Sequence, residues 1–175
     1  MGKYKEALQL IMEKIPLPGV LGRVCPAPCE EACVLSINEP AVTIELIEKT
    51  IIEKAFAQGW MTPQPPAQRT GKQVAVIGSG PAGLACAQQL NRAGHHVTVM
   101  ERADRIGGLL RYGIPDFKLD KAIIDRRVAQ MRAEGVEFHT NTHVGVDLSA
   151  KKLLQDFDAV VLAGASEKPR DVPVT

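Results

Sequence analysis

The segment GSGPAG at residues 78–83 holds the residues best suited to bind a charged ligand. Gly78 allows a tight turn, Gly80 lets the backbone approach a pyrophosphate, and Gly83 lets a helix pack closely on a strand. Free amides at the start of the following helix would face the phosphate charge. Glu101 ends the next apolar run, where an acid can bind the hydroxyls of an adenosine ribose. The spacing therefore indicates a dinucleotide site.

The segments around this motif predict the strand, turn and helix that distinguish a dinucleotide fingerprint from a chance match. Residues 73–77 are short, apolar and β-branched, as in a buried parallel strand. Residues 84–92 contain few helix breakers and predict a helix, and residues 96–100 predict the second strand. A turn in an α/β sheet that binds nothing is the alternative, and this context disfavours it.

A second pair of glycines follows the acid, in the segment RIGGLL at residues 105–110. Gly107 and Gly108 suit a close backbone approach to a further stretch of a long ligand. Simple NAD domains usually continue into a helix here, whereas FAD must pass its ribityl chain and flavin along this edge. The pair favours FAD over NAD(P), with a tight turn alone as the remaining alternative.

Three of the four cysteines lie close together, at Cys25, Cys29 and Cys33. Pro26 and Pro28 are expected to keep this loop non-helical, so that the thiolates can turn toward one soft metal centre, as in iron–sulfur proteins. Zinc is the competing metal, but structural zinc usually uses paired Cys-x-x-Cys or Cys/His sets, and no histidine is nearby. Three buried thiols that bind no metal are the remaining alternative.

A four-iron cluster needs four ligands, and the loop supplies three. Cys86 is the remaining thiol, and it lies in the predicted helix of residues 84–92. We expect it to pack there as a small apolar side chain. The ligand set for a four-iron cluster is therefore expected to be incomplete.

The chain divides into three predicted parts: a helical cysteine-loop domain at residues 1–59, a proline-rich linker at 60–72, and a Rossmann-like FAD-binding domain at 73–175. The fold class is accordingly α/β, a parallel sheet preceded by a small all-helical domain of iron–sulfur type. Helical spacing appears at residues 3–14 and 43–59. Beyond the first βαβ unit the sequence predicts helices at 120–133 and 151–155 and strands at 136–138, 143–146 and 159–162.

Composition excludes several classes of function. The chain has 175 residues, 45% of them hydrophobic, and a formal net charge of +1, which gives no field suited to nucleic acid or to an anionic membrane. Its apolar runs are strand-sized, and its first residues lack the pattern of a secretory signal. The clustered cysteines do not form a dispersed disulfide framework. We expect a cytoplasmic protein that binds neither nucleic acid nor membrane.

Four segments together resemble one known family: GVLGRVCPAPCEEAC at residues 19–33, NEPAVTI at 38–44, GSGPAGL at 78–84 and GGLLRYGIP at 107–115. The chain resembles, from about Ala7 to Val174, the small (β) subunits of NADPH-dependent glutamate synthase. The amino-terminal part of dihydropyrimidine dehydrogenase and the flavoprotein subunits of ferredoxin–NADP transhydrogenases are similar as well. The GGLLRYGIP segment is far more specific than the glycine fingerprint.

The resemblance implies an electron-transfer function. In such subunits NADPH reduces FAD, and electrons pass through four-iron clusters to a large partner subunit that forms glutamate from 2-oxoglutarate and ammonia. The family's upstream cysteine motif and its NADPH-binding domain have no counterpart in these 175 residues. We therefore expect a truncated form or fragment that is inactive alone and depends on the large subunit or another electron acceptor. A non-catalytic nucleotide-binding or subunit-docking module is the alternative.

The resemblance also assigns site residues, with no catalytic acid or base among them. The FAD positions are Gly78, Gly80, Pro81, Ala82, Gly83 and Leu84 around the pyrophosphate, Glu101 at the adenosine ribose, Arg105, Gly107, Gly108 and Leu109 along the ribityl side, Lys118 as a basic contact and Val144 as a backbone contact to the adenine. Cys25, Cys29 and Cys33 match three cluster ligands. Glu48 matches a position that ligates a second cluster in some relatives, and we expect it to be a solvated or capping acid here.

Overall fold

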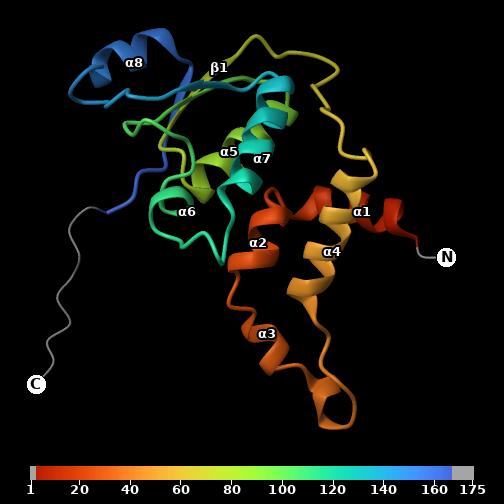
Figure 1. Ribbon diagram of the computed structural model, residues 1–175. Coiled ribbons are helices and arrows are strands. Elements are labelled where there is room, and N and C mark those ends of the chain that lie inside the picture. Colours follow the sequence, from red (N-terminus) through yellow and green to blue (C-terminus); the bar gives the residue numbers. More distant parts are fainter. Residues whose placement is uncertain (1–2, 167–175) are drawn as a thin grey trace, which may run out of the picture.

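The computed structural model describes residues 3–166 and consists of a helical amino-terminal part followed by a parallel α/β part (Figure 1). The first part contains α1 (Tyr4–Lys14), α2 (Pro18–Val24), α3 (Pro28–Glu31), the 3-10 helix η1 (Val34–Ile37) and α4 (Ile44–Ala57). The second contains β1 (Gln73–Ile77), α5 (Pro81–Arg92), β2 (His96–Met100), α6 (Leu109–Tyr112), α7 (Lys121–Ala133), β3 (Glu137–His139), α8 (Ala150–Asp156) and β4 (Ala159–Leu162). The predicted fold class is confirmed.

The four strands form one parallel sheet in the order β3-β2-β1-β4. Val76 of β1, which is fully buried, pairs with Val99 on one side and Val161 on the other. Side chains of α5 and α7 pack in the larger core cluster on one face, and Leu153 of α8 packs on the other. In this arrangement the strand order reverses between β1 and β4, and open α/β sheets bind ligands at the carboxyl ends of the strands beside such a point.

The helical part packs directly on the α/β part through α2. Leu17 and Val20 are buried in the same cluster as Val128 and Met131 of α7. Helices α1 and α4 form a smaller cluster of their own around Ile52. Figure 1 shows α2 and α4 beside α7, with α3 and the 3-10 turn at the end farthest from the sheet. Over the residues that the structure describes, no helix has the length and apolar character needed to span a membrane.

The structure corrects the sequence prediction at two segments. The cysteine loop is not free of helix, because Pro28 begins the short helix α3. Proline fits a first helical position, since its missing amide has no partner there in any case. The strand predicted at residues 143–146 is wrong: Gly145 has a φ of +95°, and the segment makes only an isolated bridge between Val144 and Leu148.

Residues 60–72 form no regular helix or strand, as expected for a linker, yet they pack along both parts of the chain. Trp60 joins the cluster of α1 and α4. Arg69 donates hydrogen bonds of 2.7 Å to the Asn91 side chain and to the carbonyl of His95. The division into 1–59, 60–72 and 73–175 stays a prediction, and residues 167–175 of its last part lie outside the described residues.

A carboxylate on α4 joins the two parts. Glu53 accepts hydrogen bonds from both terminal nitrogens of Arg126 on α7, one of them at 3.0 Å, and pairs with Arg23 of α2 at 3.0 Å. The Arg126 guanidinium also lies 3.9 Å from the centre of the Phe56 ring. Hydrogen bonds from Arg126, and then from Arg23, outweigh burial and lower the pKa of Glu53 from its ordinary value of 4.5.

Glu53→Gln is therefore expected to lower the free energy of unfolding at pH 7, and by only about 1 kcal/mol, because the Glu53 side chain is 36% exposed and solvent screens the ion pair. A carboxyl group whose pKa is lower in the folded protein than in the unfolded chain stabilises the folded state at pH values above its unfolded pKa. This stabilisation is lost as the pH falls through the pKa of the folded protein. The difference between parent and variant should therefore be full above pH 4.5 and shrink as the pH falls through the lowered pKa of Glu53. Urea unfolding between pH 3 and 7 measures it, with exposed Glu13→Gln as control. A difference that does not change with pH would contradict the ion-pair explanation.

Candidate dinucleotide site and cysteine loop

The first glycine turn is closed too tightly for side chains at two of its positions. Gly78 has a φ of +106°, and a Cβ there would lie 2.6 Å from the carbonyl oxygen of Ala163. A Cβ on Gly83 would lie 2.0 Å from the carbonyl oxygen of Gly78. These two glycines therefore let the ends of β1 and β4 and the start of α5 approach one another, as the motif predicts.

Gly80 has the opposite environment. It precedes Pro81, the first residue of α5, with φ −65° and ψ −179°. Apart from Gly80 itself and its two chain neighbours, no atom of the described residues lies within 4 Å of the position that its Cβ would take. The backbone here is open to a ligand at the amino end of a helix of 12 residues, where helix amides and the helix dipole favour a phosphate. This geometry fits the pyrophosphate of a dinucleotide.

Glu101 lies beside this turn but is only 8% exposed. Its carboxylate accepts hydrogen bonds from the Ser79 amide at 3.0 Å, the Ser79 hydroxyl at 2.6 Å and the Ala103 amide at 2.9 Å. Burial raises the pKa of Glu101, but these donors outweigh it and hold the pKa below 4.5. Because a carboxylate accepts about four hydrogen bonds, a ribose hydroxyl would share it with three protein donors.

The second glycine pair lies directly on the first turn. Gly107 and Gly108 have φ values of +132° and +53°, and a Cβ on Gly108 would lie 2.9 Å from the Cα of Gly80. The Gly107 amide donates to the Ser79 hydroxyl at 3.0 Å. The structure thus brings Gly80, Glu101 and the second glycine pair together. Sequence analysis missed Ser79, although a hydroxyl in a segment otherwise made of glycine, proline and alanine was a possible signal.

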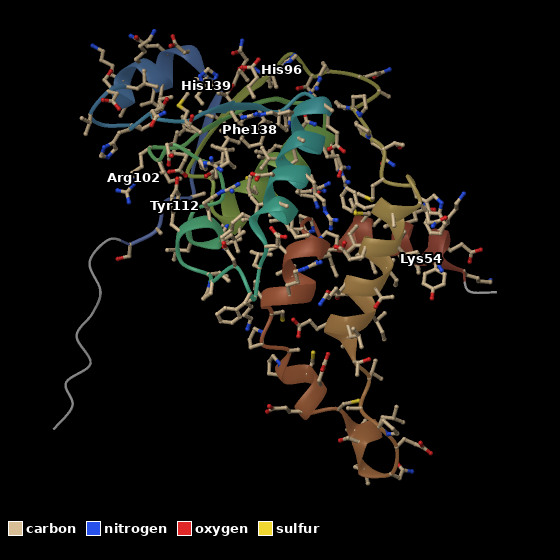
Figure 2. The ribbon with its side chains drawn as sticks, in the orientation of Figure 1. Lys54, His96, Arg102, Tyr112, Phe138 and His139 are labelled. Carbon is tan, nitrogen blue, oxygen red and sulfur yellow. The ribbon has the colours of Figure 1, made fainter. Side chains whose placement is uncertain are left out.

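Two further predicted positions, Arg105 and Leu109, belong to the loop that carries the second glycine pair. Arg105 is exposed, and its amide donates to the Tyr112 hydroxyl at 3.1 Å; that hydroxyl in turn donates to Asp104. Figure 2 labels Arg102, in the loop that follows β2, and Tyr112, at the end of α6. Leu109 is 66% exposed.

Lys118 and Val144, the other predicted FAD contacts, lie outside this loop. Lys118 is exposed in the turn before α7, and its amide donates to the carbonyl of Pro115. Val144 packs beside Met100 and Leu153 on the face of the sheet covered by α8. Both stay predictions as ligand contacts.

The three clustered cysteines lie in separate short elements. Cys25 caps the end of α2, Cys29 is exposed within α3, and Cys33 precedes the 3-10 turn. Within residues 3–166, no three cysteine, histidine or acidic side chains are placed to hold a metal ion. The thiols are therefore not gathered in this structure, and a cluster would have to draw the loop together as it binds.

The donor chemistry of this loop nevertheless suits a soft metal. A hydrogen bond from the backbone of Val42, and then one from Leu35, lowers the pKa of the Cys33 thiol from 9.0, which favours the metal-binding thiolate. Cys86 differs, because burial in α5 raises its pKa, in agreement with a packing role. Glu48 is half-buried on α4, where burial and then Glu45 raise its pKa.

The fold and the site define a Rossmann-like dinucleotide-binding domain joined to a helical cysteine domain. Family models match the same two parts. Residues 1–60 match the model of dihydropyrimidine dehydrogenase domain II, 4Fe-4S cluster, and residues 76–128 match the NAD(P)-binding Rossmann-like domain.

Sequence identity to known proteins identifies a narrower family within this class. The chain is 59% identical over 173 residues, 99% of its length, to 36% of the glutamate synthase [NADPH] small chain of Mycobacterium tuberculosis. It is 56% identical over 98% of its length to 8% of the glutamate synthase [NADH] of Schizosaccharomyces pombe. The chain is thus a relative of the glutamate synthase small chain and spans about a third of that protein's length.

A solved structure supports the fold. The oxidoreductase FprA of Mycobacterium tuberculosis superposes with a TM-score of 0.53 and 25% identity, over 59% of this chain and 25% of FprA.

Proposed function

We propose that this chain is the FAD-binding and cluster-bearing part of an electron-relay oxidoreductase of the glutamate synthase type. The observation that carries the proposal is the contact between the two glycine segments, where Gly108 lies against Gly80. A ligand held at the first turn must pass the second pair, and a long dinucleotide such as FAD has the length to meet both. The high identity to glutamate synthase small chains supports the same class.

The residues of this chain would bind and orient the dinucleotide. The open backbone at Gly80 and the amides at the start of α5 would hold the pyrophosphate, and Glu101 would accept from the adenosine ribose. Gly107 and Gly108 would border the ribityl chain. FAD, when bound, supplies hydride acceptance and single-electron transfer, which no side chain of this site provides.

The cysteine loop would carry an iron–sulfur centre that passes electrons onward, with Cys25, Cys29 and Cys33 as thiolate ligands. The final acceptor would be a large glutamate synthase subunit or another electron-accepting partner in the cytoplasm, and NADPH would be the donor. In support, the fungal relative contains a segment similar to this chain within a far longer glutamate synthase polypeptide.

A second candidate function is a non-catalytic nucleotide-binding or subunit-docking module. Exposed apolar side chains beside the cysteine loop favour it: Val34 is 80% exposed and Ile37 84% exposed. Flavin binding distinguishes the two functions.

The purified 175-residue chain should bind FAD at a ratio of one to one, be yellow after gel filtration, and melt at a higher temperature when FAD is added. A ligand present at 100 times its dissociation constant stabilises the folded state by about 2.7 kcal/mol, which thermal unfolding detects easily. A colourless protein whose melting temperature does not respond to FAD would contradict the proposal and favour the docking module.

Cys29→Ser is expected to remove most of the iron and sulfide that the parent chain takes up during anaerobic reconstitution. Serine replaces a soft thiolate with a hydroxyl that binds iron poorly. Iron and acid-labile sulfide counts per chain measure the effect. Cys86→Ser is the matched control, because it removes a half-buried thiol of α5 outside the loop and should leave the iron count unchanged. Equal iron in Cys29→Ser and parent would place the cluster elsewhere.

A further inference from the structure

One buried hydroxyl joins all three segments of the dinucleotide site. Ser79 follows Gly78 directly and is fully buried. Its hydroxyl donates to a carboxylate oxygen of Glu101 at 2.6 Å and accepts from the amide of Gly107 at 3.0 Å. Its own amide donates to the same Glu101 oxygen at 3.0 Å. The end of β1, the end of β2 and the second glycine pair thus meet at Ser79.

The hydroxyl is more than a satisfied polar group in a core. A small buried position in a tight turn accommodates alanine equally well, and alanine needs no hydrogen-bond partners. Here the donor and the acceptor roles of one hydroxyl are both used, and both partners belong to segments that border the ligand. The Gly107 amide is itself buried, so removing its acceptor would leave a donor without a partner.

We propose that Ser79 is a positioning residue of the dinucleotide site: its hydroxyl orients the Glu101 carboxylate and holds the second glycine pair against Gly80. This inference rests on the proposed FAD site and adds to it a residue that need not touch the ligand. Without the hydroxyl, Glu101 keeps its bonds to the Ser79 and Ala103 amides, but the second glycine pair loses its hydrogen bond to the first turn. FAD must then order that loop as it binds, which reduces its affinity.

Ser79→Ala should weaken FAD binding about 10-fold or more, measured by equilibrium titration of flavin fluorescence on the full chain. Ser149→Ala is the matched control. Ser149 caps α8, and its hydroxyl likewise accepts from a backbone amide, that of Lys152 at 3.2 Å, in an element that does not contribute to the glycine segments. The Ser149→Ala variant should lose a similar amount of stability, while its FAD affinity stays equal to that of the parent.

Ser79→Thr restores the hydroxyl and should bind FAD within about 3-fold of the parent, whereas a role in filling space alone would be met by alanine. A double-mutant cycle with Glu101→Gln should show strong non-additivity, because Ser79 acts partly through Glu101. If Ser79→Ala does not fold, Ser79→Cys takes its place, since it keeps the volume and substitutes a weakly hydrogen-bonding thiol.

The outcomes separate this inference from the function on which it rests. A parent chain that binds no FAD contradicts the proposed function and the inference together. A parent chain that binds FAD, with Ser79→Ala or Ser79→Cys binding it equally well, contradicts the inference alone. Equal weakening in Ser79→Thr and Ser79→Ala would also overturn it, because the hydroxyl would then not be the group that matters.

Discussion

Gly80→Val is expected to abolish FAD binding while the protein still folds. The Cβ position of Gly80 faces open space within the described residues, and its φ of −65° and ψ of −179° suit valine before a proline. The branched side chain would instead occupy the space through which the pyrophosphate approaches the amino end of α5. A loss of affinity of at least 100-fold, on the order of 3 kcal/mol, is expected from flavin titration.

Gly80→Ala provides an intermediate step, because its single carbon blocks less of the approach. Circular dichroism and the melting temperature of the ligand-free chain should be close to the parent's for both variants. FAD binding by folded Gly80→Val with parental affinity would show that the ligand lies elsewhere and would overturn the proposed site.

Gly83→Ala, three residues further on, is expected to destabilise the fold itself. Its new Cβ would lie 2.0 Å from the carbonyl oxygen of Gly78, a backbone atom that no side-chain rotation can move away. The start of α5 would have to shift away from β1, so we expect a loss of more than about 3 kcal/mol in the free energy of unfolding. Urea unfolding of the ligand-free chain measures this loss.

Gly164→Ala is the control for Gly83→Ala. It lies at the same edge of the sheet, and among the described residues nothing lies within 4 Å of its Cβ position. Its free energy of unfolding should change by less than about 0.5 kcal/mol. If Gly83→Ala were as stable as this control, the close packing of the first turn on α5 would be wrong.

Gly80 and Gly83 show how much of the candidate site can be predicted from the sequence. The motif identifies both Gly80 and Gly83 as necessary, because the spacing of a strand, a turn and a helix requires close approach at each. It also predicts that one approach is to a ligand and the other to the protein. The structure shows the close approach to the protein at Gly83, whose Cβ position is blocked; the Cβ position of Gly80 is open, and the approach of a ligand there stays a prediction.

The cysteine loop marks where pattern reasoning failed locally. The sequence predicts that Pro26 and Pro28 keep the loop non-helical, yet Pro28 stands at the first position of α3. Proline excludes a helix only from its interior, and its position in a helix depends on where the chain turns. The preceding helix α2 is held by Leu17 and Val20, which are buried in one cluster with side chains of α7, more than a hundred residues later in the chain.

The sequence by itself determined the parallel α/β class, the strands β1 and β2, the helix between them and the glycines of both segments. All of these follow from short-range periodicity and from the conformations that only glycine allows. Tertiary structure alone decided that Gly108 lies on Gly80, that Ser79 joins Glu101 to Gly107, and that Glu53 joins α4 to α7. These contacts unite segments far apart in the chain, and their partners are chosen by the packing of the whole sheet and its helices, which no local pattern encodes.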